Sequence, residues 1–189
     1  MADVPTEEKV AAERERLQYQ KRYRQTIRTT IYALIVVAAV AVLIATMFLP
    51  VLQVSGSSME PTLEDGDIIV LVETGDFETG DLVGFYYQNK LLLKRVIAGP
   101  GDVVDIDEKG NVYVNDELLD EPYVTEKALG ESDREYPYQV PDGRYFVMGD
   151  NRATSIDSRS TAIGCIETDQ IVGKVIFRIW PLNHLSLIR

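Results

Sequence analysis

The sequence contains an apolar run of nineteen residues without a charge, IYALIVVAAVAVLIATMFL, from Ile31 to Leu49. As an α-helix this run would extend about 28 Å, which is about the thickness of the hydrocarbon core of a bilayer. A buried helix of a soluble protein is rarely this long and apolar on every face. A cleavable signal peptide would end in small residues, whereas this run ends in Phe48-Leu49-Pro50 and follows a long charged segment. The sequence therefore predicts an uncleaved transmembrane helix over residues 29–50.

The charges on the two sides of this run differ in sign. The last basic residues before it are Lys21, Arg22, Arg24 and Arg28, and the first charges after it are Glu60, Glu64, Asp65 and Asp67. Because basic residues favour the cytoplasmic side of a membrane, we expect a cytoplasmic N-terminal segment over residues 1–28 and an extracytoplasmic domain over residues 51–189. Within the N-terminal segment, residues 7–25 are polar and either helical or disordered.

Beyond residue 50 the pattern changes to short runs rich in Val, Ile, Tyr and Phe, which is typical of β-strands. The runs are DIIVLVE, DLVGFYYQ, KLLLKRVIA, DVVDI, NVYVN, RYFVMG and IVGKVIFRIW. Several adjoin a Gly-Asp pair (66–67, 80–81, 101–102 and 149–150), in which glycine suits a tight turn. We expect a mainly β fold with a coiled antiparallel sheet, and a polar, mobile insertion over residues 126–137.

The composition argues against several kinds of site. The chain has 30 acidic and 19 basic residues without a local basic patch, so we expect no nucleic acid partner. Its one cysteine, Cys165, excludes an internal disulfide bond and a cysteine-based zinc cluster. Its one histidine, His184, lies in the motif-free stretch WPLNHLSLIR and gives weak support to a Ser/His/Asp triad. We expect neither a metal ion nor a cofactor.

A serine cluster in VSGSSMEPTLEDGD begins shortly after the apolar run. A serine hydroxyl becomes a good nucleophile when a general base removes its proton, and a lysine serves as that base when apolar surroundings lower its pKa. Lys94, within the strand LLLKRVIA, is such a candidate. A strand lysine whose charged end reaches solvent fits the same alternation equally well. The next residue, Arg95, would need an anionic partner if it were buried.

A third stretch, FVMGDNRATSIDSR from Phe146 to Arg159, interleaves Asp, Arg and Ser in a loop between strands. Loops of this polarity are often simply solvated. Interleaved Asp and Arg also form rigid, ion-paired platforms, and a hydroxyl on such a platform would hold a neutral lysine amine in position.

In this order and after one apolar span, GSSMEPTL, LLLKRVIAGPGD and MGDNRATSIDSR resemble the successive motifs of bacterial type I signal peptidases, also called leader peptidases. The resemblance continues to IVGKVIFRIWPL and is strongest to the short, single-span form of Gram-positive bacteria. It implies a membrane-bound Ser/Lys endopeptidase with a coiled antiparallel β-sheet catalytic domain and no cofactor. The implied partners are the lipid bilayer and exported precursor proteins, cut after Ala-X-Ala at the plasma membrane.

The resemblance also implies roles for single residues. Ser58, directly before Met59, would be the nucleophile and would offer its backbone N–H to the oxyanion, and Lys94 would be the general base. Supporting roles would fall to Ser155, which orients Lys94, to an Asp157–Arg159 pair and to an Arg95–Asp150 pair. The substrate-binding residues would be Val54, Gly56, Met59, Leu63 and Leu93, with sheet edges at residues 52–56 and 91–94 receiving the substrate backbone.

The chain departs from the family pattern at two places. Where some members carry a second oxyanion-binding hydroxyl, two residues before the nucleophile, this chain has Gly56, so a backbone N–H or water would supply that contact. Ala153-Thr154 replaces the usual Asp-Asn, which implies a change of loop packing that leaves the dyad intact.

Two rival functions stay open at this point. An autoproteolytic Ser/Lys protein of the repressor type shares the dyad, but the membrane span counts against it. An inactive, membrane-tethered scaffold is the other, and the joint presence of Ser58, Lys94 and Ser155 counts against that reading.

Overall fold

The computed structural model describes residues 7–188; residues 1–6 of the expected N-terminal segment, and Arg189, lie outside the described residues. The chain divides into two compact units between Phe48 and Leu49. The first unit contains one uninterrupted helix, α1 (Glu7–Phe48), so the polar residues 7–25 are helical. The helix ends two residues before Pro50, whose ring and missing N–H oppose its continuation. By length and composition, Glu13–Ile44 could cross a membrane.

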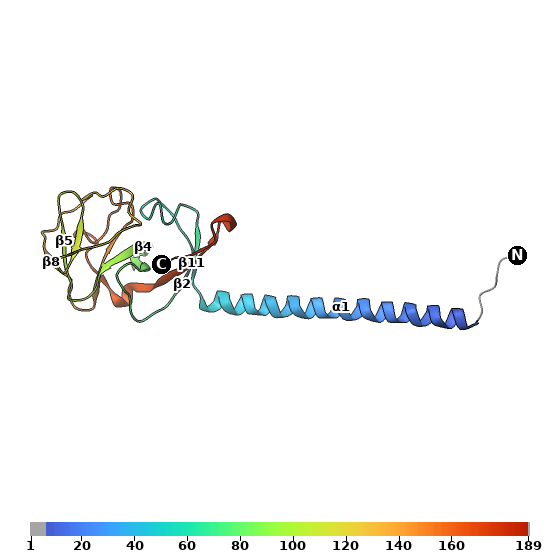
Figure 1. Ribbon diagram of the computed structural model, residues 1–189. Coiled ribbons are helices and arrows are strands. Elements are labelled where there is room, and N and C mark those ends of the chain that lie inside the picture. Colours follow the sequence, from blue (N-terminus) through green and yellow to red (C-terminus); the bar gives the residue numbers. More distant parts are fainter. Residues whose placement is uncertain (1–6, 189) are drawn as a thin grey trace. The chain divides into compact units, whose positions relative to one another are not determined.

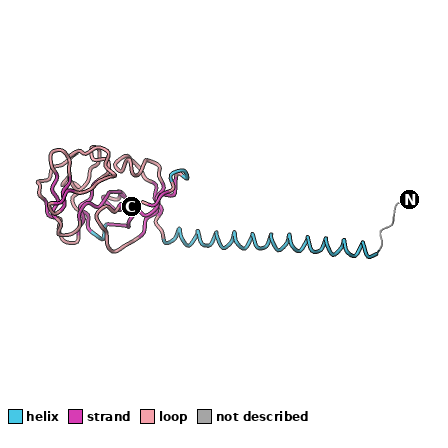
Figure 2. Tube along the Cα trace, in the orientation of Figure 1, coloured by secondary structure: helices cyan, strands magenta, loops and turns pink. Residues whose placement is uncertain are grey.

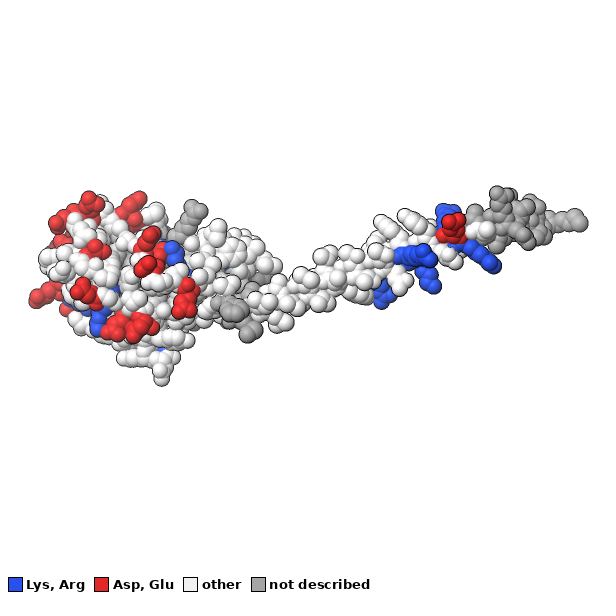
Figure 3. Space-filling model, turned by 90° about the horizontal axis from the view of Figure 1, so that it is seen from below, with Lys and Arg blue, Asp and Glu red and all other residues white. Residues whose placement is uncertain are grey.

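Charge is distributed unevenly along α1. Figure 3 shows its basic side chains in the N-terminal half, followed by a long stretch without charge. At the boundary, Arg28 Nε donates a hydrogen bond of 3.1 Å to the Tyr32 hydroxyl, and its guanidinium lies 5.4 Å from the centre of the Tyr32 ring. A basic residue beside a tyrosine at the end of an apolar run is typical of a membrane interface.

The second unit consists mainly of antiparallel strands (Figures 1 and 2). Its larger sheet has eight strands in the order β1-β2-β11-β3-β4-β9-β10, with β12 paired to β11, and its smaller sheet has four in the order β7-β6-β5-β8. The strands of the larger sheet are β1 (Val51–Gln53), β2 (Ile68–Val72), β3 (Leu82–Tyr87), β4 (Lys90–Ala98), β9 (Arg144–Met148), β10 (Ile166–Glu167), β11 (Ile171–Trp180) and β12 (Ser186–Leu187). Those of the smaller sheet are β5 (Val103–Ile106), β6 (Val112–Val114), β7 (Glu117–Leu118) and β8 (Tyr138–Gln139). Short 3₁₀ helices η1 (Thr168–Gln170) and η2 (Leu182–His184) lie at the two ends of β11.

This arrangement confirms the predicted mainly antiparallel β fold preceded by one N-terminal helix. Every run identified in the sequence forms a strand, and β4 and β11 match KLLLKRVIA and IVGKVIFRIW residue for residue. The strands β7, β8, β10 and β12 are not predicted, because two residues show no periodicity.

Strand β4 is buried on both faces over its second half. Val96 packs with Phe85 in one apolar cluster, and Ile97 packs with Phe146 in another. A strand covered on both faces has a continuous apolar run, which explains VIA at the end of β4. Lys94 lies where this buried half begins.

Two strand edges near Lys94 have no partner strand among the described residues. Strand β3 pairs with β4 from Lys90 to Arg95, but β9 joins the opposite edge of β4 only from Arg95 onward. Strand β1 pairs with β2 and with no other strand. The backbone of residues 90–94 and of β1 is therefore available for further hydrogen bonds.

Three of the four Gly-Asp pairs that adjoin predicted strands form the predicted turns. Gly66, Gly80 and Gly101 have φ of 91°, 99° and 86°, a left-handed conformation that favours glycine. The aspartates that follow them accept hydrogen bonds from a backbone N–H three residues earlier. Gly149 is different, because its φ is not positive and its neighbours are in the site described below.

The segment predicted as a mobile insertion, residues 126–137, has no regular secondary structure. It is hydrogen-bonded to the polar loop after β9: Arg159 donates to the carbonyls of Ala128 and Leu129, and the Thr161 N–H and hydroxyl donate to Asp133. Mobility of this segment stays a prediction.

Candidate active site

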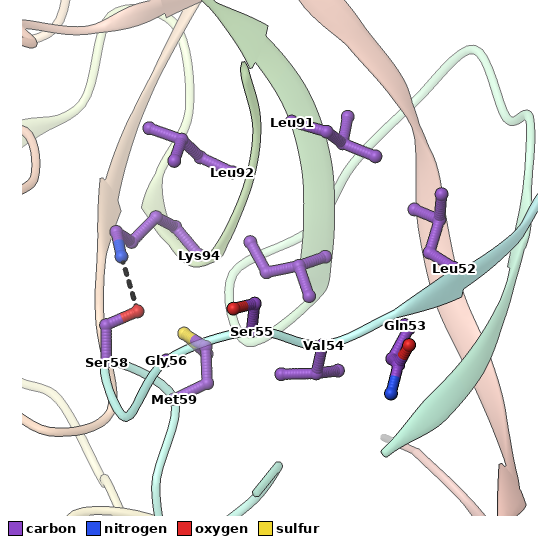
Figure 4. A pocket seen from close by; sticks show the side chains of 11 residues that line it. Leu52, Gln53, Val54, Ser55, Gly56, Ser58, Met59, Leu91, Leu92 and Lys94 are labelled. Carbon is purple, nitrogen blue, oxygen red and sulfur yellow. Dashed lines mark hydrogen bonds between the residues drawn. The ribbon is translucent and has the colours of Figure 1, made fainter. Parts of the chain in front are cut away.

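Ser58 and Lys94 meet although 36 residues separate them in the chain. Ser58 lies in the turn that follows β1, and Lys94 lies on β4. Figure 4 shows their side chains pointing toward each other, and Lys94 Nζ donates a hydrogen bond of 2.8 Å to Ser58 Oγ. The structure thus brings together the two residues for which the sequence predicts the central chemistry.

The surroundings of Lys94 favour its neutral form. The residue is 4% exposed, and this burial lowers the pKa of its amine below the ordinary value because desolvation penalises the ammonium. Nearby charges act in both directions: Asp157 raises the pKa, Arg159 lowers it and Asp150 raises it. Burial is the largest of these effects. Of the two interpretations of Lys94 that the sequence allows, the structure therefore favours a buried lysine with a lowered pKa over a lysine whose charged end reaches solvent.

Arg95 is buried and paired. Its Nε and Nη2 donate to the two carboxylate oxygens of Asp150 at 2.8 and 2.6 Å, and Nη1 donates to the Gly80 carbonyl at 2.7 Å. The Thr62 hydroxyl donates to Asp150 Oδ2 at 2.5 Å. Removing one partner of a buried ion pair costs about 3–5 kcal/mol, because the other charge is left without a partner. The pair therefore fixes the first residues of the polar loop against β4.

The second predicted pair is also formed. Arg159 Nε and Nη2 donate to Asp157 Oδ1 and Oδ2, each at 2.8 Å, and both side chains are fully buried. Asp157 Oδ2 also accepts the Gly149 N–H at 2.9 Å. A two-point contact between planar groups restricts their orientation, so this pair holds the loop as a rigid platform.

Ser155 is buried beside this platform, and its Oγ has no hydrogen-bond partner among the residues that the structure describes. The hydrogen bond to Lys94 implied by the resemblance is not formed, so the orienting role of Ser155 stays a prediction. Ser155 packs against Gly149: a methyl group on Gly149 would lie 2.3 Å from Ser155 Oγ and 2.6 Å from the Ser58 carbonyl oxygen.

An apolar cleft of about 200 Å³ opens in front of Ser58 and Lys94 (Figure 4). Its walls are residues 52–56, Ser58, Met59 and residues 91–94, which include both predicted sheet edges. Of the predicted substrate-binding residues, Val54, Gly56, Met59 and Leu93 line the cleft. Leu63 does not line it and is fully buried in the apolar cluster beneath, which contains Val54 and Met59.

Gly56 is fixed by a side chain that the sequence analysis does not single out for this purpose. Its N–H donates to Asp65 Oδ1 at 2.8 Å, and its φ is 93°. Because this N–H already has an acceptor, Gly56 does not offer it to the cleft.

Two further residues near the site, Glu121 and Tyr123, are not predicted from the sequence. Glu121 is buried and forms an ion pair with Arg152, and the Arg95 guanidinium lies 3.8 Å from the centre of the Tyr123 ring. The sequence contains one signal that could have found Glu121. Arg152 lies in a loop of acidic and basic residues, and neither of the two predicted ion pairs gives it an acidic partner.

The single cysteine and the single histidine of the chain are not part of the active site. Cys165 is a buried, free thiol, and His184 is exposed in η2. Within residues 7–188 no group of His, Cys, Asp and Glu side chains is placed to hold a metal ion.

Comparison with known proteins identifies the family. The sequence profile described as signal peptidase, peptidase S26, matches residues 27–180. Signal peptidase IB of Staphylococcus aureus (strain N315) is 39% identical over 154 residues, covering 70% of this chain and 78% of that protein. Signal peptidase I of Bacillus licheniformis is 36% identical over 169 residues, covering 81% and 88%. A crystal structure of a signal peptidase I from Enterococcus faecalis V583 superposes with a TM-score of 0.45 at 25% identity, covering 52% of this chain and 96% of that chain. From the family match and these relatives, the chain belongs to the signal peptidases of peptidase family S26, serine peptidases that remove signal peptides from exported precursor proteins.

Proposed function

We propose that Ser58 is the nucleophile and Lys94 the general base of this peptidase. The observation that carries the proposal is the 2.8 Å hydrogen bond between Ser58 Oγ and a buried lysine amine on the wall of an apolar cleft. Neutral Lys94 takes the Ser58 hydroxyl proton as Oγ attacks the carbonyl carbon of the scissile bond. The resulting ammonium gives that proton to the leaving amine nitrogen, and an ester of Ser58 remains. Lys94 then takes a proton from water as the water oxygen attacks the ester carbon, and it returns that proton to Ser58 Oγ as the ester bond breaks and releases the signal peptide.

Five further residues support this dyad in the proposal. The pairs Arg95–Asp150 and Asp157–Arg159 hold the polar loop against β4, so that Lys94 stays buried and its aliphatic part stays fixed. Ser155 orients the amine once Lys94 is neutral and able to accept a hydrogen bond. The Ser58 N–H binds the oxyanion, and water or a backbone N–H other than that of Gly56 supplies the second contact.

The cleft supports binding of the precursor as an extended strand. The unpaired edges of β1 and of residues 90–94 offer backbone hydrogen bonds to a chain lying between them. Alternate side chains of such a strand point to the same side, toward a cleft of about 200 Å³ that Val54, Met59 and Leu93 help to line. We propose that this selects small residues at the first and third positions before the cut, as in Ala-X-Ala.

We further propose that α1 anchors the protein in the plasma membrane as a single span. The basic residues before the apolar stretch and the acidic second unit support a cytoplasmic N-terminus and an extracytoplasmic peptidase domain. Protection of residues 1–28, but not of the second unit, from protease added to intact cells tests this orientation.

The proposed specificity is tested on a precursor with Ala-X-Ala before the cut and on a matched precursor with leucine at both alanine positions. We expect cleavage of the first after the final alanine, and at least about 10² times slower cleavage of the second, because bulky side chains misplace the scissile bond. Sequencing the new N-terminus of the product gives the position. Equal cleavage of both precursors, or a cut elsewhere, would contradict the proposed use of the cleft.

The pH dependence should follow Lys94. Only its neutral form accepts a proton, so kcat/KM declines as pH falls below the Lys94 pKa, and burial moves this acid limb below the ordinary lysine value of 10.5. We expect Lys109→Met, which removes an exposed lysine outside the cleft, to leave the limb in place. Measurement of kcat/KM against pH checks this, and an acid limb at 10.5 or above would contradict a buried base.

A further inference from the structure

Glu121 lies outside the three motifs, in the segment that follows β7. Its side chain is fully buried and contacts Arg152, whose Nη1 donates to Oε2 at 3.2 Å and whose Nη2 donates to Oε1. Arg152 is 1% exposed, so this is a buried pair between residues 31 positions apart. Nothing in the proposed chemistry uses it.

The pair is connected to the reaction centre through one peptide unit. Arg152 Nε donates to the Gly149 carbonyl at 3.1 Å, while the Gly149 N–H donates to Asp157 at 2.9 Å. Each backbone group of Gly149 is therefore bound by a member of a different buried ion pair. Such contacts to charged groups are stronger and more directional than those between neutral groups.

Gly149 in turn lies directly behind the proposed dyad. Its α-carbon faces the Ser58 carbonyl oxygen and the Ser155 side chain with no space for a methyl group. Two residues later, the Asn151 N–H donates to the same Ser58 carbonyl at 3.1 Å. A shift of the Gly149 backbone would therefore displace Ser58 or Ser155.

We infer that Glu121 is a positioning residue of the Ser58–Lys94 centre, acting through Arg152 on the Gly149 backbone. This inference rests on the proposed function of the dyad. The neighbouring Tyr123 adds to it, because its ring packs on the Arg95 guanidinium and its hydroxyl donates to Glu121 Oε1 at 3.4 Å. The segment 121–123 thus contacts two of the three arginines whose ion pairs brace the loop around Gly149, namely Arg95 and Arg152.

The test compares Glu121→Gln with Asp120→Asn, a change at the exposed neighbouring carboxylate, in the full-length protein in detergent. We expect Glu121→Gln to lower kcat about 10- to 100-fold, because small displacements of reacting groups are costly. KM should stay within about twofold, since Glu121 does not line the cleft. Asp120→Asn should match the wild type in both parameters.

A double-mutant cycle shows whether Glu121 acts through Arg152. In an Arg152→Met background, Glu121→Gln should cause no further loss of kcat, whereas losses that add would overturn the inference. A wild-type kcat for Glu121→Gln, or a raised KM with unchanged kcat, would overturn it too. If Glu121→Gln does not fold, Arg152→Lys tests the same link, because an ammonium cannot reach Glu121 and the Gly149 carbonyl together. A wild-type kcat for that variant would overturn the inference.

Lys94→Met, measured in parallel, distinguishes a failure of the proposed Ser58–Lys94 dyad from a failure of the positioning role of Glu121. Cleavage by Lys94→Met would refute the dyad itself. An inactive Lys94→Met together with a wild-type kcat for Glu121→Gln would refute the positioning role alone.

Discussion

Replacing Lys94 with methionine is expected to lower kcat for an Ala-X-Ala precursor by about 10³-fold or more. Methionine keeps the length and apolar contacts of the buried stem but has no amine to take the Ser58 proton. The fold should survive, because the change removes a buried amine whose charged form is already disfavoured. Single-turnover cleavage in detergent, with the unfolding midpoint measured in parallel, checks both expectations.

Three companion variants sharpen this test. Lys94→Arg should be equally inactive, because guanidinium does not give up its proton. Ser58→Ala combined with Lys94→Met should lose no more than either single change, since the two residues act as one unit. Lys109→Met, at an exposed position outside the cleft, should cleave like the wild type. An active Lys94→Arg enzyme would end the case for a lysine base.

Gly149→Ala is expected to lower kcat about 10²-fold or more, although it adds one methyl group. That methyl would lie 2.3 Å from Ser155 Oγ, 2.5 Å from Ser155 Cβ and 2.6 Å from the Ser58 carbonyl oxygen, so at least one of these groups must move. Overpacking of this kind costs about 1–3 kcal/mol of stability, which leaves a folded protein to assay. Steady-state kinetics and thermal unfolding, measured on the same sample, separate the two effects.

Gly75→Ala is the matched control for that change. Gly75 also precedes an aspartate, but its φ is not positive and no heavy atom lies within 4 Å of an added methyl group. We expect unchanged kcat and unchanged or slightly higher stability, because alanine restricts the unfolded chain. A Gly149→Ala enzyme as active as Gly75→Ala would contradict the described packing behind Ser58.

The contrast between these glycines shows which roles of a glycine can be predicted from the sequence and which cannot. Of the five Gly-Asp pairs in the sequence, the four that adjoin predicted strands look alike, and at Gly66, Gly80 and Gly101 the turn interpretation is right, because backbone conformation is a local property. At Gly149 the glycine is required by packing against Ser58 and Ser155, which come from other positions in the chain.

The same distinction separates the predicted site residues from those that were missed. Lys94 and Arg95 are predictable because the apolar run of β4 is a local signal, and Ser58 and the polar loop are recognisable by motif. Periodicity could not decide whether Lys94 is buried, because that depends on Ser58 and the polar loop, which come from other parts of the chain and lie close to it. Glu121 could not be assigned, since its partner is 31 residues away and no local pattern pairs them.

In the proposed binding mode, the two unpaired strand edges also set an order of events for the precursor. A chain can pair with β1 and residues 90–94 only while its own backbone groups are free, so helical or folded segments are excluded from the cleft. Cleavage must therefore precede folding of the residues around the cut. A mature protein that has folded up to its first residues no longer offers such a strand, and its own structure then protects it from the enzyme that released it.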